Sequence, residues 1–208
     1  MPVVTISRQF GAGGRTLGKL VAEALGYSYT DEEIIQMVAT RARVSTNWVE
    51  SIEKESGGRL LRYMTHLVPK SFIDMVLDDQ RGYIDEEIYV DLLHQIINQL
   101  ADEGNVVIIG RGSQYVLRDR KDAYHILLIA DYADRIKFME THYNLSHREA
   151  NLVVTRQERR RINLYRKFGR EDYDLPHLYH MVINTSKQNL ETAAGLVCKL
   201  VKSHPARP

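Results

Sequence analysis

The stretch Val3–Leu17, VVTISRQFGAGGRTL, decides the fold of this chain. Its short β-branched run, Val3–Ile6, predicts a strand. A glycine-rich turn follows, and a helix is expected to open at the hydroxyl residue Thr16. Such a turn holds backbone N–H groups around a phosphate and points the positive end of a helix at it. The sequence therefore predicts a phosphate-binding loop made by Arg8, Gly11, Ala12, Gly13, Gly14, Arg15 and Thr16.

The loop departs from the P-loop pattern G-x-x-x-x-G-K-[ST] at two positions. Arg8 stands where that pattern has its first glycine, and Gly14 stands where it has its phosphate-binding lysine. In this frame Thr16 is the candidate ligand for Mg²⁺. The positive charge has to come from Arg15, Arg8 or Lys19, and an arginine would bind phosphate through a planar pair of hydrogen bonds.

A second frame of the same pattern begins later in the chain. Gly13-x-x-x-x-Gly18-Lys19 has the required glycines and lysine, but the next residue is Leu20, which has no hydroxyl for a metal. This frame also puts Lys19 inside the helix that follows the loop, because apolar residues recur there at helical spacing. We therefore prefer the first frame.

Composition places the chain among ordinary globular proteins. Its 208 residues are 44% hydrophobic and 26% charged, and its net charge is only +1. No global field favours nucleic acid or a membrane surface, so any basic site has to be local. The single cysteine, Cys198, excludes an intrachain disulfide framework and fits a reducing cytosol. Because neither a signal peptide nor a membrane-spanning run is recognised, we expect a cytoplasmic protein without a membrane partner.

Strand-like and helix-like patterns alternate along the chain. Short apolar runs predict five strands, at 3–6, 27–29, 106–109, 125–130 and 181–184. The spacing of apolar residues predicts helices over 17–25, 92–100 and 190–201. Ser146–Glu149 reads as a capping box that opens a long basic helix running to Lys167. This alternation favours a mainly parallel α/β sheet covered on both faces.

The segment from about residue 31 to 101 contains no convincing strand and is expected to be a helical insertion. Apolar residues are frequent between Leu60 and Leu77 for a surface loop. A small helical subdomain would explain them, and so would a surface that binds a partner. We expect a homodimer formed through this insertion.

Several blocks of sequence carry a resemblance to a known family. They are ISRQFGAGGR at 6–15, VVIIGRG at 106–112, DYADR at 131–135, ERRRINLY at 158–165 and MVINTS at 181–186. In order and spacing, from about Val3 to Val201, the chain resembles the cytidylate kinase-like family, a divergent branch beside the nucleoside monophosphate kinases. That branch has the same Gly-Gly-Arg in place of Gly-Lys. The missing lysine therefore separates the chain from true cytidylate kinases and not from its closer relatives.

The resemblance implies a P-loop nucleoside-kinase-like, three-layer α/β/α fold with a five-stranded parallel sheet. It implies one domain over residues 1–208, with a core formed by 1–30 and 102–204. The insertion at about 31–101 would bind the acceptor, and a basic helical lid would span about 146–172.

The resemblance also assigns residues to the acceptor site. Asp31 occupies the place of an aspartate that contacts the acceptor nucleotide, although a helix cap beside Thr30, with Thr30-x-x-Glu33 as capping box, explains it as well. Arg111 matches an arginine that contacts the acceptor phosphate, at the end of a strand where ligands bind in such sheets. Gly112 replaces an acidic residue of the family pattern, and Ile109 replaces another.

The lid assignments come from the basic stretch that begins at Arg156. Glu158 and Arg161 align with the D-x-x-R part of the family's lid pattern. The preceding arginine of that pattern falls on Val154, so Arg156 or Arg160 would have to serve. A solvated helix face explains a charge run equally simply, but here one acid among the basic residues is too few to neutralise them by pairing along the helix.

These assignments predict a nucleotide-binding phosphotransferase that uses ATP and Mg²⁺. The γ-phosphoryl group would pass to a nucleoside monophosphate, such as CMP or dCMP, or to another small phosphorylated acceptor. Arg15, Arg111, Glu158 and Arg161 are the candidate catalytic residues. Asp31, Arg111, Arg156 and Arg160 are the candidate acceptor-binding residues.

Two other functions compete with phosphoryl transfer. The absent lysine and the missing acid at Gly112 favour a catalytically weak or inactive nucleotide-binding regulatory module. Nucleic-acid binding through Arg156–Arg170 is disfavoured, because only Tyr165 and Phe168 offer rings for stacking there and the net charge is close to zero.

Overall fold

The computed structural model describes residues 1–42, 86–170 and 173–203. Five strands form one sheet in the order β2-β3-β1-β4-β5, and every neighbouring pair is parallel. The predicted parallel sheet is therefore confirmed, with shifts of one or two residues at some strand ends. The strands are β1 Val3–Arg8, β2 Ser28–Thr30, β3 Val106–Ile109, β4 Ala123–Ile129 and β5 Met181–Asn184.

Helices connect the strands in the described part of the chain. One expectation is corrected: α1 begins at Gly14 with Gly13 as its N-cap, so Thr16 is the third helical residue and does not open the helix. Gly13 takes the cap because its left-handed φ of 80° suits glycine there. The helices are α1 Gly14–Leu25, α2 Glu33–Ala42, α6 Glu86–Glu103, α7 Ser113–Val116, α8 Tyr132–Tyr143, α9 His147–Lys167, the 3₁₀ turn Pro176–Leu178 and α10 Leu190–Ser203.

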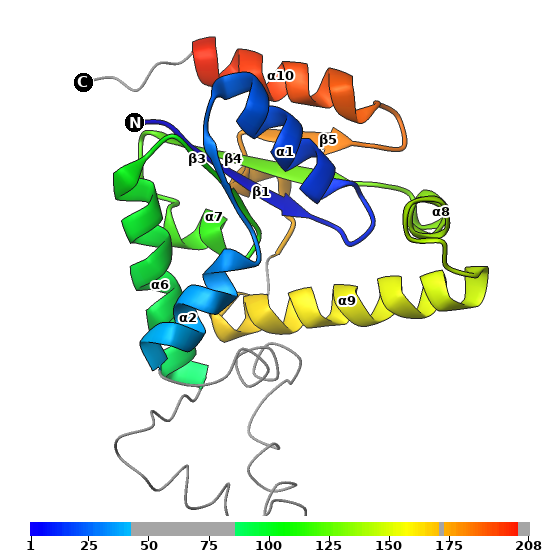
Figure 1. Cartoon of the computed structure of the whole chain (residues 1–208), viewed down its shortest axis with the longest axis horizontal. Helices are drawn as coiled ribbons and strands as arrows, with labels where there is room; N and C mark the ends of the chain where they lie inside the picture. The colour runs from blue at the N-terminus through cyan, green and yellow to red at the C-terminus, as the bar shows by residue number, and fades with distance from the viewer. Residues whose placement is uncertain (43–85, 171–172, 204–208) are drawn as a thin grey trace, which may run out of the picture.

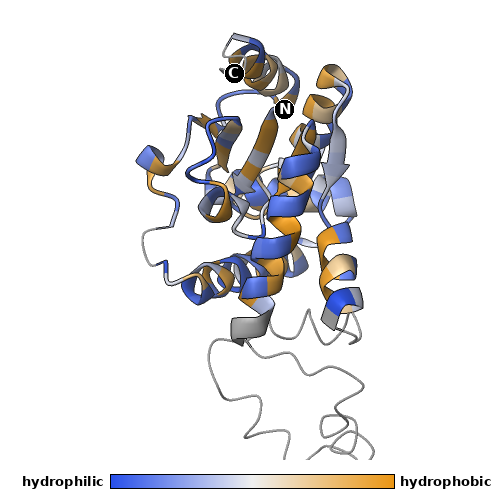
Figure 2. Ribbon diagram, turned by 90° about the vertical axis from the view of Figure 1, so that its left-hand side faces the viewer, coloured by the Kyte–Doolittle hydropathy of each residue, from blue (hydrophilic) through white to orange (hydrophobic). Residues whose placement is uncertain are grey.

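The sheet is the middle of three layers (Figure 1). Helices α1 and α10 cover one face, where Leu17 and Val197 pack against strand residues such as Ile6. Helices α2 and α6 cover the other face, and their apolar stripes bury Ile34 and Leu93 in a second core. Hydrophobic and hydrophilic residues alternate along α6, the pattern of a helix with one buried side (Figure 2). The three-layer α/β/α prediction is confirmed.

Helices α8 and α9 lie at the carboxyl end of the strands. They pack on each other through a small apolar cluster that contains Ile136 and Val154, against which Phe10 of the loop also packs. The predicted capping box is confirmed, because the Ser146 side chain accepts from the Glu149 N–H and the Glu149 carboxylate accepts from the Ser146 N–H. Helix α9 thus has a fixed start, and it runs beneath the phosphate loop (Figure 1).

The expected helical insertion is described only at its two ends. Helices α2 and α6 form these two ends and share one core. The apolar segment 60–77, on which the expected homodimer rests, lies outside the described residues. Among the helices of the described ranges, none combines the length and the apolar character needed to cross a membrane.

A buried histidine on β4 gives the sheet a pH-sensitive contact. The ring Nδ1 of His125 lies 2.8 Å from the Thr5 hydroxyl on β1, and its backbone N–H donates to Nδ1 of His180 at 3.0 Å. His125 is only 3% exposed. Burial, together with the neighbouring His180, lowers the pKa of His125 from 6.5 to about 4. The folded protein therefore holds this ring neutral where an unfolded chain would protonate it.

This depressed pKa predicts acid destabilisation. Above pH 6.5 both states hold His125 neutral, whereas between pH 6.5 and about 4 only the unfolded chain binds the proton. The free energy of unfolding should therefore fall by about 3 kcal/mol across that window, beyond the loss from other groups. Urea denaturation at pH 7 and pH 4 should give a smaller fall for His125→Gln than for the parent. His177→Gln, at an exposed position, is the matched control, and equal falls in all three proteins would contradict the assignment.

Candidate phosphate-binding site

The predicted loop surrounds the N-terminus of α1. The N–H groups of Gly14, Arg15 and Thr16 have no partner within the helix, and no side chain of the described residues caps Gly13. An anion is the natural partner for such a helix end. Ala12 differs from its neighbours, because its N–H donates to the Gln9 carbonyl at 3.1 Å and its side chain is buried. The amides that remain available to an anion are therefore those of the first helical turn.

Two features of the turn require glycine. Gly11 has a φ of 88°, and a Cβ there would lie 2.9 Å from the Arg135 carbonyl oxygen. Gly13 has a φ of 80°, and a Cβ there would press against the Leu190 side chain. Backbone that must run this close to its neighbours admits no side chain. The glycines thus let α8 and α10 pack directly against the loop.

A cleft of about 380 Å³ opens in front of the loop. It is enclosed by the loop, α2, α8 and α9, and it lies at the carboxyl ends of the parallel strands, where open α/β sheets bind ligands. Its volume falls within the usual range for small-molecule sites. One wall is apolar and partly aromatic, and is made by Phe10, Ile35, Phe138, Met139 and Tyr143. Gly11, Gly13, Gly14 and Thr16 all line the cleft, while Ala12 does not.

Positive charge dominates a second pocket that shares lining residues with this cleft, and which we call the inner pocket. This pocket of about 130 Å³ is lined by five arginines but, among the described residues, by one carboxylate, that of Asp31. The arginines come from the end of β1, the start of α1, the end of β3 and helix α9, and are Arg8, Arg15, Arg111, Arg160 and Arg161. This excess of guanidinium groups favours an anionic ligand.

Arg15 is held by two carboxylates. Its Nε lies 2.6 Å from Asp31 Oδ2 and its Nη2 lies 2.6 Å from Glu32 Oε1. Burial alone would lower the pKa of Arg15, but these two carboxylates raise it overall. Asp31 is 3% exposed and therefore serves as an internal counter-ion. The alternative capping box, Thr30-x-x-Glu33, is not formed as expected. The Glu33 carboxylate accepts from the Asp31 N–H at 2.9 Å and not from the Thr30 N–H.

Arg111 sits in a strained segment. Gly110, Arg111 and Gly112 have φ values of 66°, 58° and 71°, so three successive residues are left-handed. An arginine adopts this conformation at an energetic cost that the surroundings must offset, and such strain gathers at functional sites. Gly112 is fixed by packing as well, because a Cβ there would lie 2.6 Å from the Phe168 ring. The turn directs Arg111 to the cleft.

Glu158 ties the predicted lid to the loop. Its carboxylate accepts from the Phe10 N–H at 2.9 Å and pairs with Arg135 of α8 at 3.3 Å. It also pairs with Arg161, whose guanidinium makes two further bonds, of 2.7 and 2.6 Å, to Asp174. Burial lowers the pKa of Arg161, but the two carboxylates raise it well above its usual range. Arg161 lines the inner pocket with its charge already matched.

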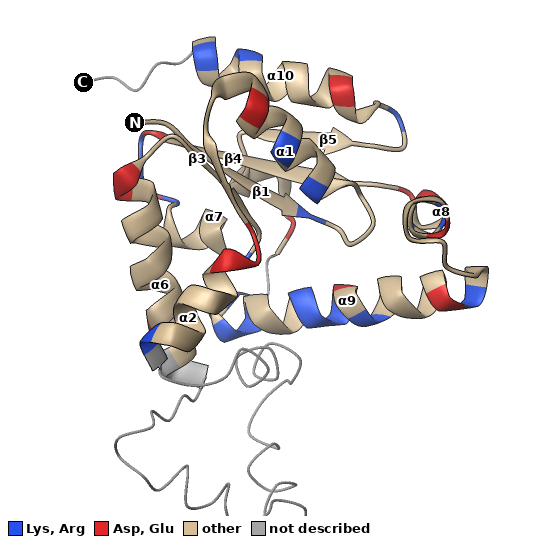
Figure 3. Ribbon diagram, in the orientation of Figure 1, with Lys and Arg blue, Asp and Glu red and all other residues tan. Residues whose placement is uncertain are grey.

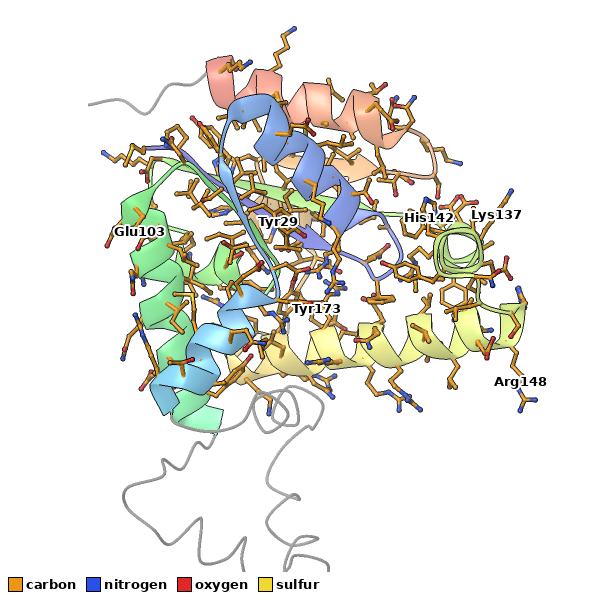
Figure 4. The ribbon with its side chains drawn as sticks, viewed as in Figure 1. Tyr29, Glu103, Lys137, His142, Arg148 and Tyr173 are labelled. Carbon is orange, nitrogen blue, oxygen red and sulfur yellow. The ribbon has the colours of Figure 1, made fainter. Side chains whose placement is uncertain are left out.

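The two remaining candidate lid arginines, Arg156 and Arg160, lie one turn apart on α9 and differ in whether they line the cleft. Arg160 and its neighbour Gln157 line the cleft. Arg156 is exposed and is not among the cleft's lining residues, so the structure does not bring it to the other predicted site residues. Basic residues recur along α9 (Figure 3), and Arg148 near its start extends away from the sheet (Figure 4). Much of this charge run is a solvated face.

Sequence reasoning missed several parts of the network. Arg135 belongs to a quoted block, yet no role was predicted for it, and Asp174 was not considered. Both are found only through partners distant in the chain, since Arg135 pairs with Glu158, 23 residues away, and Asp174 with Arg161, 13 residues away.

The choice between the two frames of the P-loop pattern is resolved by geometry. Lys19 is absent from the lining of both pockets, and its Nζ lies 6.0 Å from the Tyr29 ring centroid.

The described residues do not by themselves form a magnesium site. They contain no group of three or more His, Cys, Asp or Glu side chains arranged to hold a metal. Thr16 lines the cleft and offers one hydroxyl oxygen. Asp31 and Glu32, the acids beside Arg15, are engaged in ion pairs with it. Mg²⁺ is usually bound through one or two carboxylates together with waters and phosphate oxygens.

The Glu158 network predicts a measurable loss of stability. In Glu158→Gln the largely buried Arg135 and Arg161 lose a shared counter-charge, and the Phe10 N–H exchanges a carboxylate for a weaker acceptor. The free energy of unfolding should fall by about 2 kcal/mol, measured by urea denaturation. The control Glu23→Gln changes an exposed glutamate on α1 and should be close to neutral. A Glu158→Gln protein as stable as the control would show that the network carries no stability.

Comparisons with known proteins agree with this geometry. A search of curated protein sequences gives no match. Among solved structures, an uncharacterized protein from Eubacterium ventriosum ATCC 27560 superposes with a TM-score of 0.64 at 17% identity, covering 97% of this chain and 98% of that one. A shikimate kinase from Acinetobacter baumannii, in complex with shikimate, gives a TM-score of 0.52 at 14% identity, covering 100% and 96%. A sugar kinase from Janibacter sp. HTCC2649 gives 0.51 at 14% identity, covering 99% and 97%.

These structural likenesses show the fold alone, which the chain shares with the shikimate kinase and the sugar kinase. The family comparison goes further, because the model of the cytidylate kinase-like family matches residues 3–187. This match includes the loop, the Gly110–Gly112 turn, helix α9 and β5. Since it spans most of the sequence, the chain belongs to the cytidylate kinase-like family.

Proposed function

We propose that the protein is a phosphotransferase that moves the γ-phosphoryl group of ATP to a small phosphorylated acceptor, with a nucleoside monophosphate such as CMP or dCMP as the leading candidate. One observation carries this proposal: five arginines and a single carboxylate line the pocket beside an uncapped helix N-terminus. Two phosphorylated ligands meeting there would supply the missing negative charge. The family and the kinase fold support the same reaction class.

The transfer needs little covalent help from the protein. An anionic oxygen of the acceptor attacks the γ-phosphorus, and the bond from that phosphorus to the bridging oxygen breaks, with ADP leaving as the anion. Because the acceptor oxygen carries no proton at neutral pH, no general base is required. Positioning and charge neutralisation are the remaining tasks. The arginine-lined pocket is suited to both.

The residues divide into two sets under this proposal. The amides of Gly14, Arg15 and Thr16 would bind the donor phosphates, and any Mg²⁺ bound with ATP would take Thr16 as its protein ligand. Arg111 and Arg160 would bind the acceptor phosphate, because both line the inner pocket from elements outside the loop, the end of β3 and helix α9. Asp31 would orient the guanidinium groups of Arg8 and Arg15, with which it pairs. The core, insertion and lid boundaries stand as part of this proposal, as does a cytoplasmic location, which the buried free thiol of Cys198 suits.

A regulatory nucleotide-binding module is the second candidate. It is favoured by the pairing of Arg161 with Glu158 and Asp174 and of Arg15 with Asp31 and Glu32. Two guanidiniums assigned to catalysis are thus already neutralised. Isothermal titration separates the two candidates, because a module would bind ATP without turning over any acceptor.

A coupled ADP-release assay over CMP, dCMP, UMP and other small phosphorylated acceptors tests the proposal. We expect turnover with at least one acceptor, and we expect Arg111→Ala to lower its kcat/KM by about 10- to 100-fold, since a charged hydrogen bond to the acceptor is lost. Arg118→Ala is the matched control, because Arg118 is exposed and pairs with Asp119. A folded parent that binds ATP but turns over no acceptor would support the module. A parent that does not bind ATP would rule out both.

A further inference from the structure

The position of the missing P-loop lysine is filled by the side chain of another residue. Gly14 is the first residue of α1 and takes the place of that lysine. A Cβ at Gly14 would lie 2.7 Å from Cγ and 2.9 Å from Cδ of Arg8. Contacts this short do not occur between real side chains, so the stem of Arg8 passes directly over the Gly14 backbone. A lysine at position 14 would therefore have to displace the stem of Arg8 from this path.

A second glycine accommodates the other end of Arg8. A Cβ at Gly110 would overlap Nη1 of Arg8, and Gly110 has a left-handed φ of 66°. The side chain thus runs from the end of β1, across the start of α1, to the end of β3, and it lines both the cleft and the inner pocket. Two glycines from separate parts of the sequence leave room for one arginine.

The charge of Arg8 is poorly matched by its surroundings. Its side chain is 22% exposed. Of the acidic residues in the described ranges, Asp31 alone pairs with it, and the 3.9 Å from Nη2 to Oδ1 is too long for a hydrogen bond. Burial lowers the pKa of Arg8, Asp31 opposes this, and the neighbouring Arg111 and Arg15 lower it again. An arginine stays protonated in any case, so the guanidinium retains an unmet demand for negative charge.

Arg15 is a weaker candidate for the same task. Two carboxylates bond to its guanidinium at 2.6 Å each, and its side chain is 49% exposed. Binding a phosphate there would mean breaking or sharing those pairs. Arg8 can meet a phosphate without giving up a hydrogen bond to another described residue.

We propose that Arg8 is the phosphate-binding cation of this loop, and that Arg8 and Gly14 represent an exchange of positions with the P-loop lysine. The positive charge is supplied by the last residue of β1 and not by the first turn of α1. Its planar fork would bind two oxygens of one phosphate group. The assignment deepens the proposed function and depends on it, because it presumes that a phosphate chain binds in this cleft.

Binding of ATP and of inorganic triphosphate, measured by isothermal titration, tests the assignment. Arg8→Ala should weaken the binding of both ligands by about 10- to 100-fold, the effect of losing a charged hydrogen-bond pair. Arg15→Ala should weaken it less. Lys137→Ala is the control for lost charge, since Lys137 on α8 is exposed, lines neither pocket and points away from α9 (Figure 4), and it should bind both ligands like the parent.

The exchange itself is tested by moving the charge back. Gly14→Lys alone should lower the melting temperature, because the new side chain meets the stem of Arg8. Adding Arg8→Gly should restore the melting temperature above that of the single variant and return triphosphate binding to within about tenfold of the parent. Melting is measured on every variant, so that a binding loss in a folded protein is distinguished from unfolding.

The outcomes separate this assignment from the proposed function. If the parent binds both ligands and folded Arg8→Ala binds them equally well, the assignment is wrong while the proposed function stands. It is also wrong if Gly14→Lys melts like the parent, or if Arg15→Ala loses more affinity than Arg8→Ala. A parent that binds neither ligand overturns the proposed function, and the assignment with it.

Discussion

A guanidinium group with too little negative charge around it organises this site. Arg8 extends from the central strand over Gly14 and against Gly110, and Asp31, 3.9 Å away, is its only recorded partner among the described residues. Removing a charge from water without full pairing is costly. Such an arrangement is expected where a bound anionic ligand supplies the missing counter-charge. The strained Arg111 turn and the start of α1, which no side chain of the described residues caps, line the same cleft as Arg8.

Helix α9 is coupled to the glycine-rich loop through Glu158. One carboxylate accepts from the loop backbone at Phe10 and pairs with Arg135 of α8 and Arg161 of its own helix. A displacement of α9 would therefore also displace the glycine-rich loop. Since Asp174 holds the other edge of Arg161, the predicted lid residues are pre-arranged by ion pairs before any ligand is present. Lid arginines that already have partners act more readily through positioning than through direct contact with the reacting phosphoryl group.

The sequence predicted the fold far better than the details of the site. Strands such as Val106–Ile109 and the capping box at Ser146 follow local rules, because apolar runs and caps depend on neighbours in the chain. The start of α1 was misplaced because a hydroxyl cap was expected, while Gly13 serves as the cap through its left-handed backbone. The choice between Arg156 and Arg160 could not be made, since they lie one turn apart on nearly the same side of α9, and only the packing of α9 against the loop decides which of them reaches the cleft. The passage of Arg8 over Gly14 was equally hidden, because it depends on the path of a side chain in three dimensions.

The most direct measurement is a crystal structure of the protein with a non-hydrolysable ATP analogue. The account predicts a phosphate group between the first turn of α1 and the guanidinium of Arg8, with two of its oxygens within hydrogen-bond distance of that guanidinium. A phosphate chain bound elsewhere in the cleft, or one bound at the loop while Arg8 points away from it, would contradict the account.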